Sequence, residues 1–216
     1  MKEHKVVKSG LQQRRKERIV LIAAELFLQN GIEEIKMTDI ADAAEIGVAS
    51  LYRYFGTKTA IAIEVGVLLW RDLQKLFDGC FDSEEYETLS GLEQISRQLG
   101  FLRAIYSKQP RFMAFLDDFD RLLLSQKPFP ESLSEYEQSI VDIHEVFKSS
   151  CEKGVSDGSI RAGLDYEGIY RSLTHSIIAL SQKFIRGEIL PGDDFSHAEQ
   201  ELRQLEDMAL YYLRGN

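Results

Sequence analysis

Apolar side chains recur along the chain at intervals of three and four residues, the spacing that places them on one face of a helix. The clearest case covers about residues 12–30, where the stripe consists of Ile19, Ile22, Ala23, Leu26 and Phe27. No segment shows the sustained alternation of apolar and polar residues that marks a half-buried strand, and there are only four prolines. The pattern therefore predicts an all-α chain.

Capping signals divide this pattern into about nine helices. We expect them at about residues 12–30, 39–45, 48–55, 58–77, 90–107, 110–125, 131–153, 166–186 and 196–213. A side-chain hydroxyl can accept a hydrogen bond from the free amides of a first turn, so Thr38, Thr57 and Ser90 are the expected N-caps. Gly31 can end the first helix in a left-handed conformation. Residues 78–90, rich in Asp, Glu, Ser and Gly, are expected to form a linker.

The most informative segment is Met37–Lys58, which reads MTDIADAAEIGVASLYRYFGTK. It holds a short helix, a tight turn, a second short helix and the start of a third helix. On the second short helix Leu51 and Phe55 face inward, and the outward face carries Ser50, Tyr52, Arg53 and Tyr54. This is the layout of a helix-turn-helix, which offers its second helix to the major groove of DNA. The segment therefore predicts sequence-specific DNA binding.

The charge distribution fits contact with DNA at one end, although the net charge of −9 by itself argues against a nucleic-acid partner. Residues 1–18 hold seven Lys or Arg against two Glu, and residues 1–58 hold ten basic against eight acidic side chains. The remaining residues therefore carry a net −11. A basic arm and a near-neutral head joined to an acidic body suit phosphate contact at one end only. The arm can enter the minor groove, lie on the DNA backbone or remain a solvated tail.

Catalytic and metal-binding patterns are missing from the sequence. It has no nucleophile–base pair, glycine-rich phosphate loop, HxxxH, HExxH or Cys/His cluster, so we expect no enzymatic activity, no metal and no cofactor. Cys80 and Cys151 lie 71 positions apart and are expected to be reduced structural thiols. We see no secretion signal and no apolar run long enough to cross a membrane, which predicts a cytoplasmic protein without membrane contact.

Five elements within roughly the first 65 residues fall in a recognisable order and spacing. They are carried by Ala23-Ala24 with Leu26-Phe27, Asn30-Gly31, Thr38 with Ile40-Ala41, Leu51 to Phe55, and Lys58. In these elements the chain resembles the TetR family of transcriptional regulators. It departs from the family where Glu45 replaces the usual glycine of the bend, and where Gly47 and Ala49 replace a frequent Ser or Thr and a frequent Gly. Glu45 indicates a bend that either avoids a left-handed conformation or tolerates some strain.

This resemblance implies a three-helix DNA-binding domain over residues 1–57, joined by a long helix to a helical effector-binding and dimerisation domain over residues 58–216. The candidate DNA contacts are Thr38, Gly47, Val48, Ala49, Ser50, Tyr52, Arg53, Tyr54 and Lys58. Hydroxyl tips and an ammonium at a helix start suit phosphates, so contacts of that kind are expected from Thr38, Tyr52, Tyr54 and Lys58. Thr38 can equally serve only as a cap, and Tyr54 only as a half-buried packing residue.

The candidates for base reading lie on the recognition helix, whose first turn meets the DNA most closely. Arg53 can pair with guanine in the major groove or grip a phosphate, and Ser50 is the second candidate for reading sequence. Val48 and Ala49 can offer only apolar contact, for example to a thymine methyl group.

The same resemblance implies that two copies bind a near-palindromic operator and that a small ligand in each helical body changes the spacing of the recognition helices. Candidate interface residues are Ser172, Ser176, Ala179, Leu180, Leu202, Leu205, Ala209 and Tyr212, unless these faces pack only within one subunit. Candidate pocket residues are Phe101, Tyr106, Phe115, Phe119, His144, Phe147, Tyr170 and His175. Aromatic side chains at helical spacing also form ordinary core. A buried His needs a polar partner, which a neighbouring side chain supplies as well as a ligand does.

Three hypotheses follow. The first is a repressor that a small apolar or amphipathic effector releases from an inverted-repeat operator. The second is a DNA-binding regulator of the same fold without an effector, controlled by a protein partner or by abundance. The third is a helical enzyme with a segment that only resembles a helix-turn-helix, and the missing catalytic patterns disfavour it.

Overall fold

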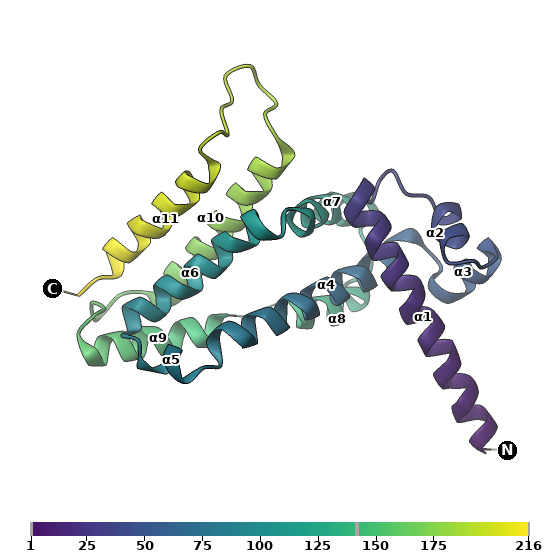
Figure 1. Cartoon of the computed structure of the whole chain (residues 1–216), viewed down its shortest axis with the longest axis horizontal. Helices are drawn as coiled ribbons and strands as arrows, with labels where there is room; N and C mark the ends of the chain where they lie inside the picture. The colour runs from purple at the N-terminus through teal and green to yellow at the C-terminus, as the bar shows by residue number, and fades with distance from the viewer. Residues whose placement is uncertain (1, 141–142, 216) are drawn as a thin grey trace. The chain divides into compact units, whose positions relative to one another are not determined.

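The computed structural model describes the backbone of residues 2–140 and 143–215, and the side chains of those ranges from Leu11 onwards (Figure 1). Across these ranges the chain forms α-helices, one short 3-10 helix at Pro130–Leu133 and no strand. The α-helices are α1 Lys2–Asn30, α2 Met37–Ala43, α3 Val48–Phe55, α4 Lys58–Phe81, α5 Glu84–Thr88, α6 Gly91–Lys108, α7 Pro110–Gln126, α8 Ser134–Ser139, α9 His144–Asp157, α10 Tyr166–Arg186 and α11 Ala198–Leu213. The all-α prediction is confirmed, with eleven α-helices in the described ranges in place of about nine.

Three of the expected helix boundaries are wrong. The first helix begins about ten residues earlier, at Lys2. The expected linker is largely helical, because α4 continues to Phe81 and α5 follows with Ser83 as its N-cap. The expected helix over 131–153 is not continuous, because α8 ends at Ser139 and Ile140 has a non-helical ψ of 128°.

The chain packs as two compact units. Unit 1 consists of Met1–Asp72 and Ala114–Ile140, and unit 2 of Leu73–Met113 and Val141–Asn216. The interruption after α8 falls at a boundary between these units, which explains why one apolar pattern does not become one helix. These units are defined by packing, and the expected functional division at residue 57 stays a prediction.

Unit 1 is built around the stripe on α1 that the sequence predicts. Ala23 and Phe27 of α1 are buried together with Ile40 of α2 and Leu51 of α3. Gly31 ends α1 with φ at +85°, as expected, and its N–H donates to the Phe27 carbonyl at 2.9 Å. The α1–α2–α3 arrangement at one end of this unit is visible in Figure 1.

The segments of α7 and α8 in unit 1 pack through aromatic rings. Phe115 and Phe119 stack with ring centroids 5.6 Å apart, and Tyr136 lies 4.8 Å from Phe119. The indole N–H of Trp70 donates to the Tyr136 hydroxyl at 3.1 Å. Burial raises the pKa of Tyr136 to about 12, so its hydroxyl stays protonated. These rings therefore form core, and Gly66 makes room for Tyr136 because an added Cβ there would lie 2.7 Å from the ring.

Unit 2 packs α6 against α9, α10 and α11 around an apolar core that includes Leu99, Phe147, Ile177 and Leu202. The predicted capping box starts α6, since the Glu93 carboxylate accepts from the Ser90 N–H at 2.8 Å and the Ser90 hydroxyl accepts from the Glu93 N–H at 3.4 Å. The two N-caps Thr57 and Ser90 are thus confirmed, with the Thr57 hydroxyl accepting from the Ala60 N–H at 3.0 Å.

The start of α6 meets α9 at an unusually close backbone approach. A Cβ added to Gly91 would lie 2.2 Å from the Gly154 nitrogen and 2.3 Å from the Ser150 carbonyl oxygen, too close for either helix to stay in place. Gly79 on α4 is the opposite case, because an added Cβ there would meet nothing within 4 Å.

We therefore expect Gly91→Ala to lower the free energy of unfolding by about 1–3 kcal/mol, since it forces the two helices apart. Gly79→Ala, the matched control, should leave stability unchanged or raise it by up to about 1 kcal/mol, because alanine is the better helix former. Urea denaturation of both variants measures the difference. Equal effects from the two substitutions would contradict this packing.

Candidate nucleic-acid interface

The first helix of the helix-turn-helix is capped differently from the prediction. α2 begins at Met37, and the Asp39 carboxylate closes its first turn by accepting from the Lys36 N–H at 2.7 Å. Thr38 lies inside the helix, is exposed, and directs its hydroxyl to Asp39 at 3.5 Å. The N-cap role expected of Thr38 is therefore wrong, and its hydroxyl remains at the surface, where its phosphate contact stays a prediction.

The turn between α2 and α3 shows which alternative holds at Glu45. Its φ of +56° is left-handed, so the bend accepts the strain that a glycine would avoid, at a cost of about 1–2 kcal/mol. Two hydrogen bonds hold the turn, from the Glu45 N–H to Asp42 at 3.1 Å and from the Ile46 N–H to Ala41 at 3.0 Å. Gly47 then serves as the N-cap residue of α3.

α3 divides its residues between a buried and an outer face, as its spacing predicts. Leu51 is fully buried and Phe55 is 9% exposed. The exposed members of the candidate set are Gly47, Ala49, Tyr52 and Arg53, and the half-buried members are Val48, Ser50 and Tyr54. Tyr54 lies with its ring 6.4 Å from that of Phe55, which fits the packing alternative for this residue. Tyr52 and Arg53 are thus the long polar side chains that α3 presents outward.

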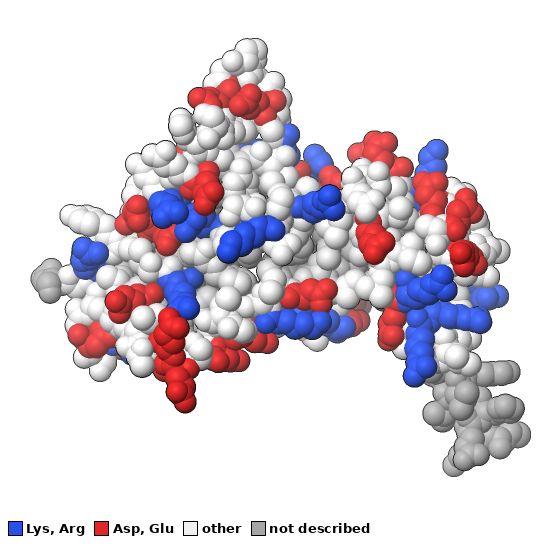
Figure 2. Space-filling view, in the orientation of Figure 1, with Lys and Arg blue, Asp and Glu red and all other residues white. Residues whose placement is uncertain are grey.

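Arg53 lies in a group of polar side chains from α1 and α3. Its guanidinium approaches the Ser50 hydroxyl at 3.4 Å and lies 5.9 Å from the Tyr54 ring. These residues, with Arg15 and Arg18 of α1, line a groove of about 360 Å³. Figure 2 shows Lys and Arg side chains gathered beside α1 in this part of unit 1. The arrangement suits a polyanion, because exposed guanidiniums can contact phosphates and base edges alike.

Arg15 and Arg18 are site residues that the sequence reasoning placed only within a basic arm. Both are exposed, and Arg18 lies 3.8 Å from the Glu45 carboxylate in a weak surface ion pair. Lys16, between them, faces elsewhere, since it pairs with Glu64 and lies 5.5 Å from the Phe55 ring. If the arm is taken as a helix, the sequence predicts that Arg15 and Arg18 lie on one face and Lys16 on another, because residues three apart share a face. The side chains of Lys2, Lys5 and Lys8 lie outside the described residues.

Lys58, expected to contact phosphate, has its ammonium turned to the protein. It donates to the backbone carbonyls of Ile32 at 2.8 Å, Glu33 at 3.1 Å and Ile35 at 3.0 Å. An ammonium has three N–H groups, and all three are used here. The geometry therefore does not match the expected phosphate contact.

The structure does not bring the candidate effector residues together. Phe115 and Phe119 belong to the core of unit 1, whereas the other six lie in unit 2. There, Phe101 packs against Phe77 and Phe81, and Tyr106 against Phe184. His175 is exposed, so it does not need the polar partner that a buried histidine requires.

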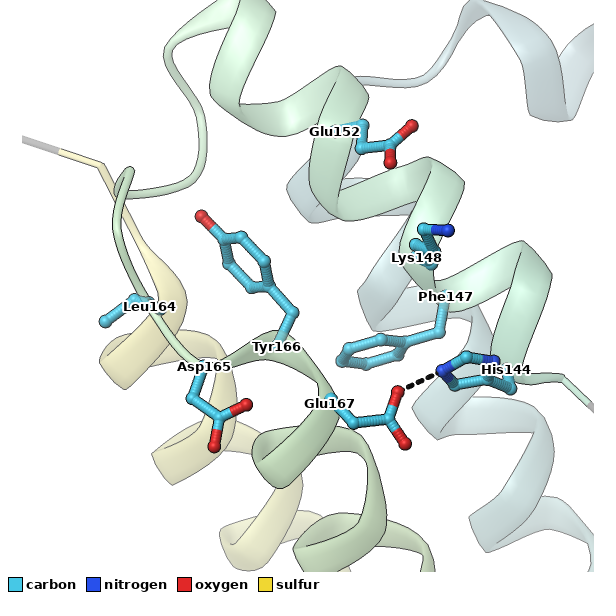
Figure 3. Close-up of a pocket in the computed structure, with 8 residues that line it drawn as sticks. All are labelled: His144, Phe147, Lys148, Glu152, Leu164, Asp165, Tyr166 and Glu167. Carbon is cyan, nitrogen blue, oxygen red and sulfur yellow. Dashed lines mark hydrogen bonds and ion pairs between the residues drawn. The ribbon is translucent and has the colours of Figure 1, made fainter.

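Three of the candidates, on α9 and α10, do meet in unit 2. The ring of Tyr170 lies 5.0 Å from His144 and 5.5 Å from Phe147. His144 and Phe147 line a pocket of about 280 Å³ together with Tyr166 and Glu167 (Figure 3). Glu167 hydrogen-bonds to the His144 ring, so a neighbouring carboxylate supplies the polar partner that this histidine requires.

The described part of the chain holds no evident metal-binding cluster, and one of its two thiols is buried. Its His, Cys, Asp and Glu side chains form no group of three or more that could hold a metal ion. Both cysteines are free, Cys80 exposed and Cys151 buried. Burial raises the pKa of Cys151 to about 12, which keeps this thiol protonated and unreactive. Within the same residues no helix is long and apolar enough to cross a membrane.

The candidate interface residues divide into two groups. Ser172, Ser176, Ala179 and Tyr212 are exposed, and Leu180 and Leu205 are half-buried. Leu202 and Ala209 are 1% and 8% exposed and belong to the core of their own unit. For these two, packing within one subunit is the correct alternative.

Comparison with known proteins decides the family. Residues 19–65 match the model described as bacterial regulatory proteins, tetR family. The chain is 30% identical over 168 residues to the HTH-type transcriptional repressor KstR2 of Rhodococcus jostii, covering 76% of each protein. The chain belongs to the TetR family. It is 29% identical over 160 residues to KstR2 of Mycolicibacterium smegmatis, covering 73% of each.

A solved structure shares the fold of this TetR-family chain. Thermus thermophilus FadR, a TetR-family repressor in complex with lauroyl-CoA, superposes with a TM-score of 0.61 at 19% identity, covering 93% of this chain and 96% of that one. The N-terminal helix-turn-helix and the helical remainder are thus family features, and the protein is a DNA-binding transcriptional repressor.

If Arg53 pairs with guanine, Arg53→Ala should weaken operator binding by about 1–3 kcal/mol and relax preference at one base pair per half-site. Binding to a library of operator variants measures both effects. Arg203→Ala, an exposed arginine on α11, is the control and should change neither. Uniform weakening with unaltered base preference would reassign Arg53 to the phosphate backbone.

Proposed function

We propose that this repressor binds an inverted-repeat operator as a homodimer through α3 of each subunit, and that a small amphipathic effector releases it. The observation that supports DNA docking most strongly is the outer face of α3, where Tyr52 and Arg53 are exposed beside Arg15 and Arg18. A groove lined by three arginines on an otherwise acidic chain gives a nucleic acid one favourable approach.

The faces of α10 and α11 support dimerisation. Ser172, Ser176 and Ala179 form an exposed row of small residues on α10. On α11, Met208 and Tyr211 are 58% and 82% exposed, an unusual amount for large apolar side chains on one helix. Two such helices from each subunit can form a four-helix interface, because small residues allow close approach and large ones fill the space between helices.

Ala179→Glu should therefore convert the protein to monomers, because it places a charge in the α10 row of small residues. Sedimentation velocity measures the mass, and the operator affinity should fall as well, since two linked half-site contacts become independent. Ser107→Glu on α6, also an exposed position, is the control and should leave the dimer intact. A wild-type protein that is monomeric when it binds operator would refute the dimer.

The effector class is proposed from the chemistry of unit 2 and from the acyl-CoA complex of the FadR relative. Half-buried aromatic side chains, including Phe101, Tyr106 and Tyr170, provide apolar surface that the fold does not cover completely. An acyl chain with a polar head matches such surface, because ligand sites in helical bundles are mostly apolar with few polar groups. Acyl-CoA thioesters are thus the first compounds to test.

We expect lauroyl-CoA to raise the melting temperature and to release the operator over the same concentration range, whereas free CoA should do neither. At a concentration one hundred times its Kd, a ligand that binds only the folded state adds about 2.7 kcal/mol of stability. Thermal-shift and fluorescence-anisotropy titrations measure the two effects. If no acyl-CoA or other amphipathic compound releases the operator, the second hypothesis, control by a protein partner or by abundance, replaces this one.

A further inference from the structure

The backbone turn that joins α1 to α2 is held by charged side chains from two other helices. The turn covers residues 31–36, and Ile32 and Ile35 are buried within it, 2% and 7% exposed. Peptide groups that are buried with these two side chains must find partners, because each unpaired group costs about 1–3 kcal/mol. Those partners are Lys58, at the start of α4, and Asp118, in the middle of α7.

Lys58 satisfies the carbonyl side of the turn. Its ammonium donates to three of the turn's carbonyl oxygens, on Ile32, Glu33 and Ile35, all at 3.1 Å or less. Bonds of this kind are stronger than neutral ones, because the donor carries a full charge. The side chain is half-buried, so these bonds are also partly screened from water.

Asp118 satisfies the amide side of the same turn. Its carboxylate accepts from the Ile32 N–H at 3.1 Å, so Ile32 is held by a cation at its carbonyl and an anion at its amide. Gly31 leaves room for this contact, since an added Cβ would lie 2.9 Å from the Asp118 carboxylate. Arg121 hydrogen-bonds to the other carboxylate oxygen, and this bond raises the pKa of the Arg121 guanidinium.

The turn sets the direction in which α2 leaves α1, and α2 in turn packs against α3. From these contacts we infer that Lys58 and Asp118 are positioning residues for operator binding: together they fix the 31–36 turn, and Lys58 does so in place of a phosphate contact. The inference rests on the proposed operator binding, and it concerns residues that do not themselves touch DNA.

The salt dependence of operator binding separates the two roles of Lys58. Removing a phosphate contact makes the plot of log K against log salt shallower by about one unit, whereas removing a positioning contact leaves its slope unchanged. We expect Lys58→Met to weaken operator binding about tenfold at every salt concentration, with the wild-type slope. Lys75→Met, an exposed lysine further along α4, is the control and should not change affinity.

Asp118 provides an independent second variant, because it lies on another helix. Asp118→Ala should weaken binding to a similar degree with an unchanged slope, and it should speed hydrogen exchange at the Ile32 amide. Asp118→Asn keeps an acceptor oxygen and should recover most of the affinity. Asp120→Asn, an exposed carboxylate on the same helix, is the control. If Lys58→Met does not fold by circular dichroism, Lys58→Gln, which retains two N–H donors, takes its place.

A slope shallower by about one unit for the Lys58 variant, or wild-type affinity for either the Lys58 or the Asp118→Ala variant, would overturn the inference. These outcomes differ from failure of the proposed function. In that case the wild-type protein itself would bind no inverted-repeat duplex better than a scrambled one.

Discussion

The burial of one face of α3 is the constraint on which the DNA-binding part of this chain depends. Leu51 and Phe55 are held in the core of unit 1, and this contact fixes which side of an eight-residue helix faces outward. So short a helix is not stable alone, because its few hydrogen bonds do not offset the backbone entropy that is lost when its first turn is ordered. The exposed position of Tyr52 and Arg53 is therefore a consequence of packing on the opposite face.

A few positively charged side chains lie beside the outer face that this packing leaves exposed. The exposed guanidiniums of Arg15, Arg18 and Arg53 lie around one groove, while the rest of the chain carries most of the acidic residues. Fixed cations next to a rigid helix orient a polyanion before any base is read, since phosphate contacts position and base contacts specify. Lys16 and Lys58 differ from these arginines, because Lys16 pairs with Glu64 and Lys58 donates to backbone carbonyls of the protein.

The helix-turn-helix could be predicted from the sequence because its signals are local. The α1 stripe, the stop at Gly31 and the cap at Thr57 depend on residues a few positions apart, and all are found. The partners of Lys58 could not be predicted, since they lie 23 to 26 positions away and depend on the path of the 31–36 turn.

The errors among the interface and pocket candidates share one cause, because periodicity does not show what an apolar helix face packs against. Leu202 and Ala209 belong to the core of unit 2, while Met208 and Tyr211 on the same helix are exposed. Both faces of α11 thus carry apolar residues, so the pattern does not indicate which one meets a second subunit. The aromatic residues of the body are similarly ambiguous, because a ring that lines a pocket and a ring that fills a core have the same spacing.

Chemical footprinting with dimethyl sulfate tests the central claim, that α3 of two subunits enters the major groove, most directly. The reagent methylates guanine N7, which lies in that groove, and a helix lodged there protects it. On a duplex selected from genomic fragments, we expect protected guanines in two half-sites about one helical turn, or roughly 34–36 Å, apart. Guanine N7 positions that remain fully reactive throughout a saturated complex, or protection confined to a single half-site, would contradict it.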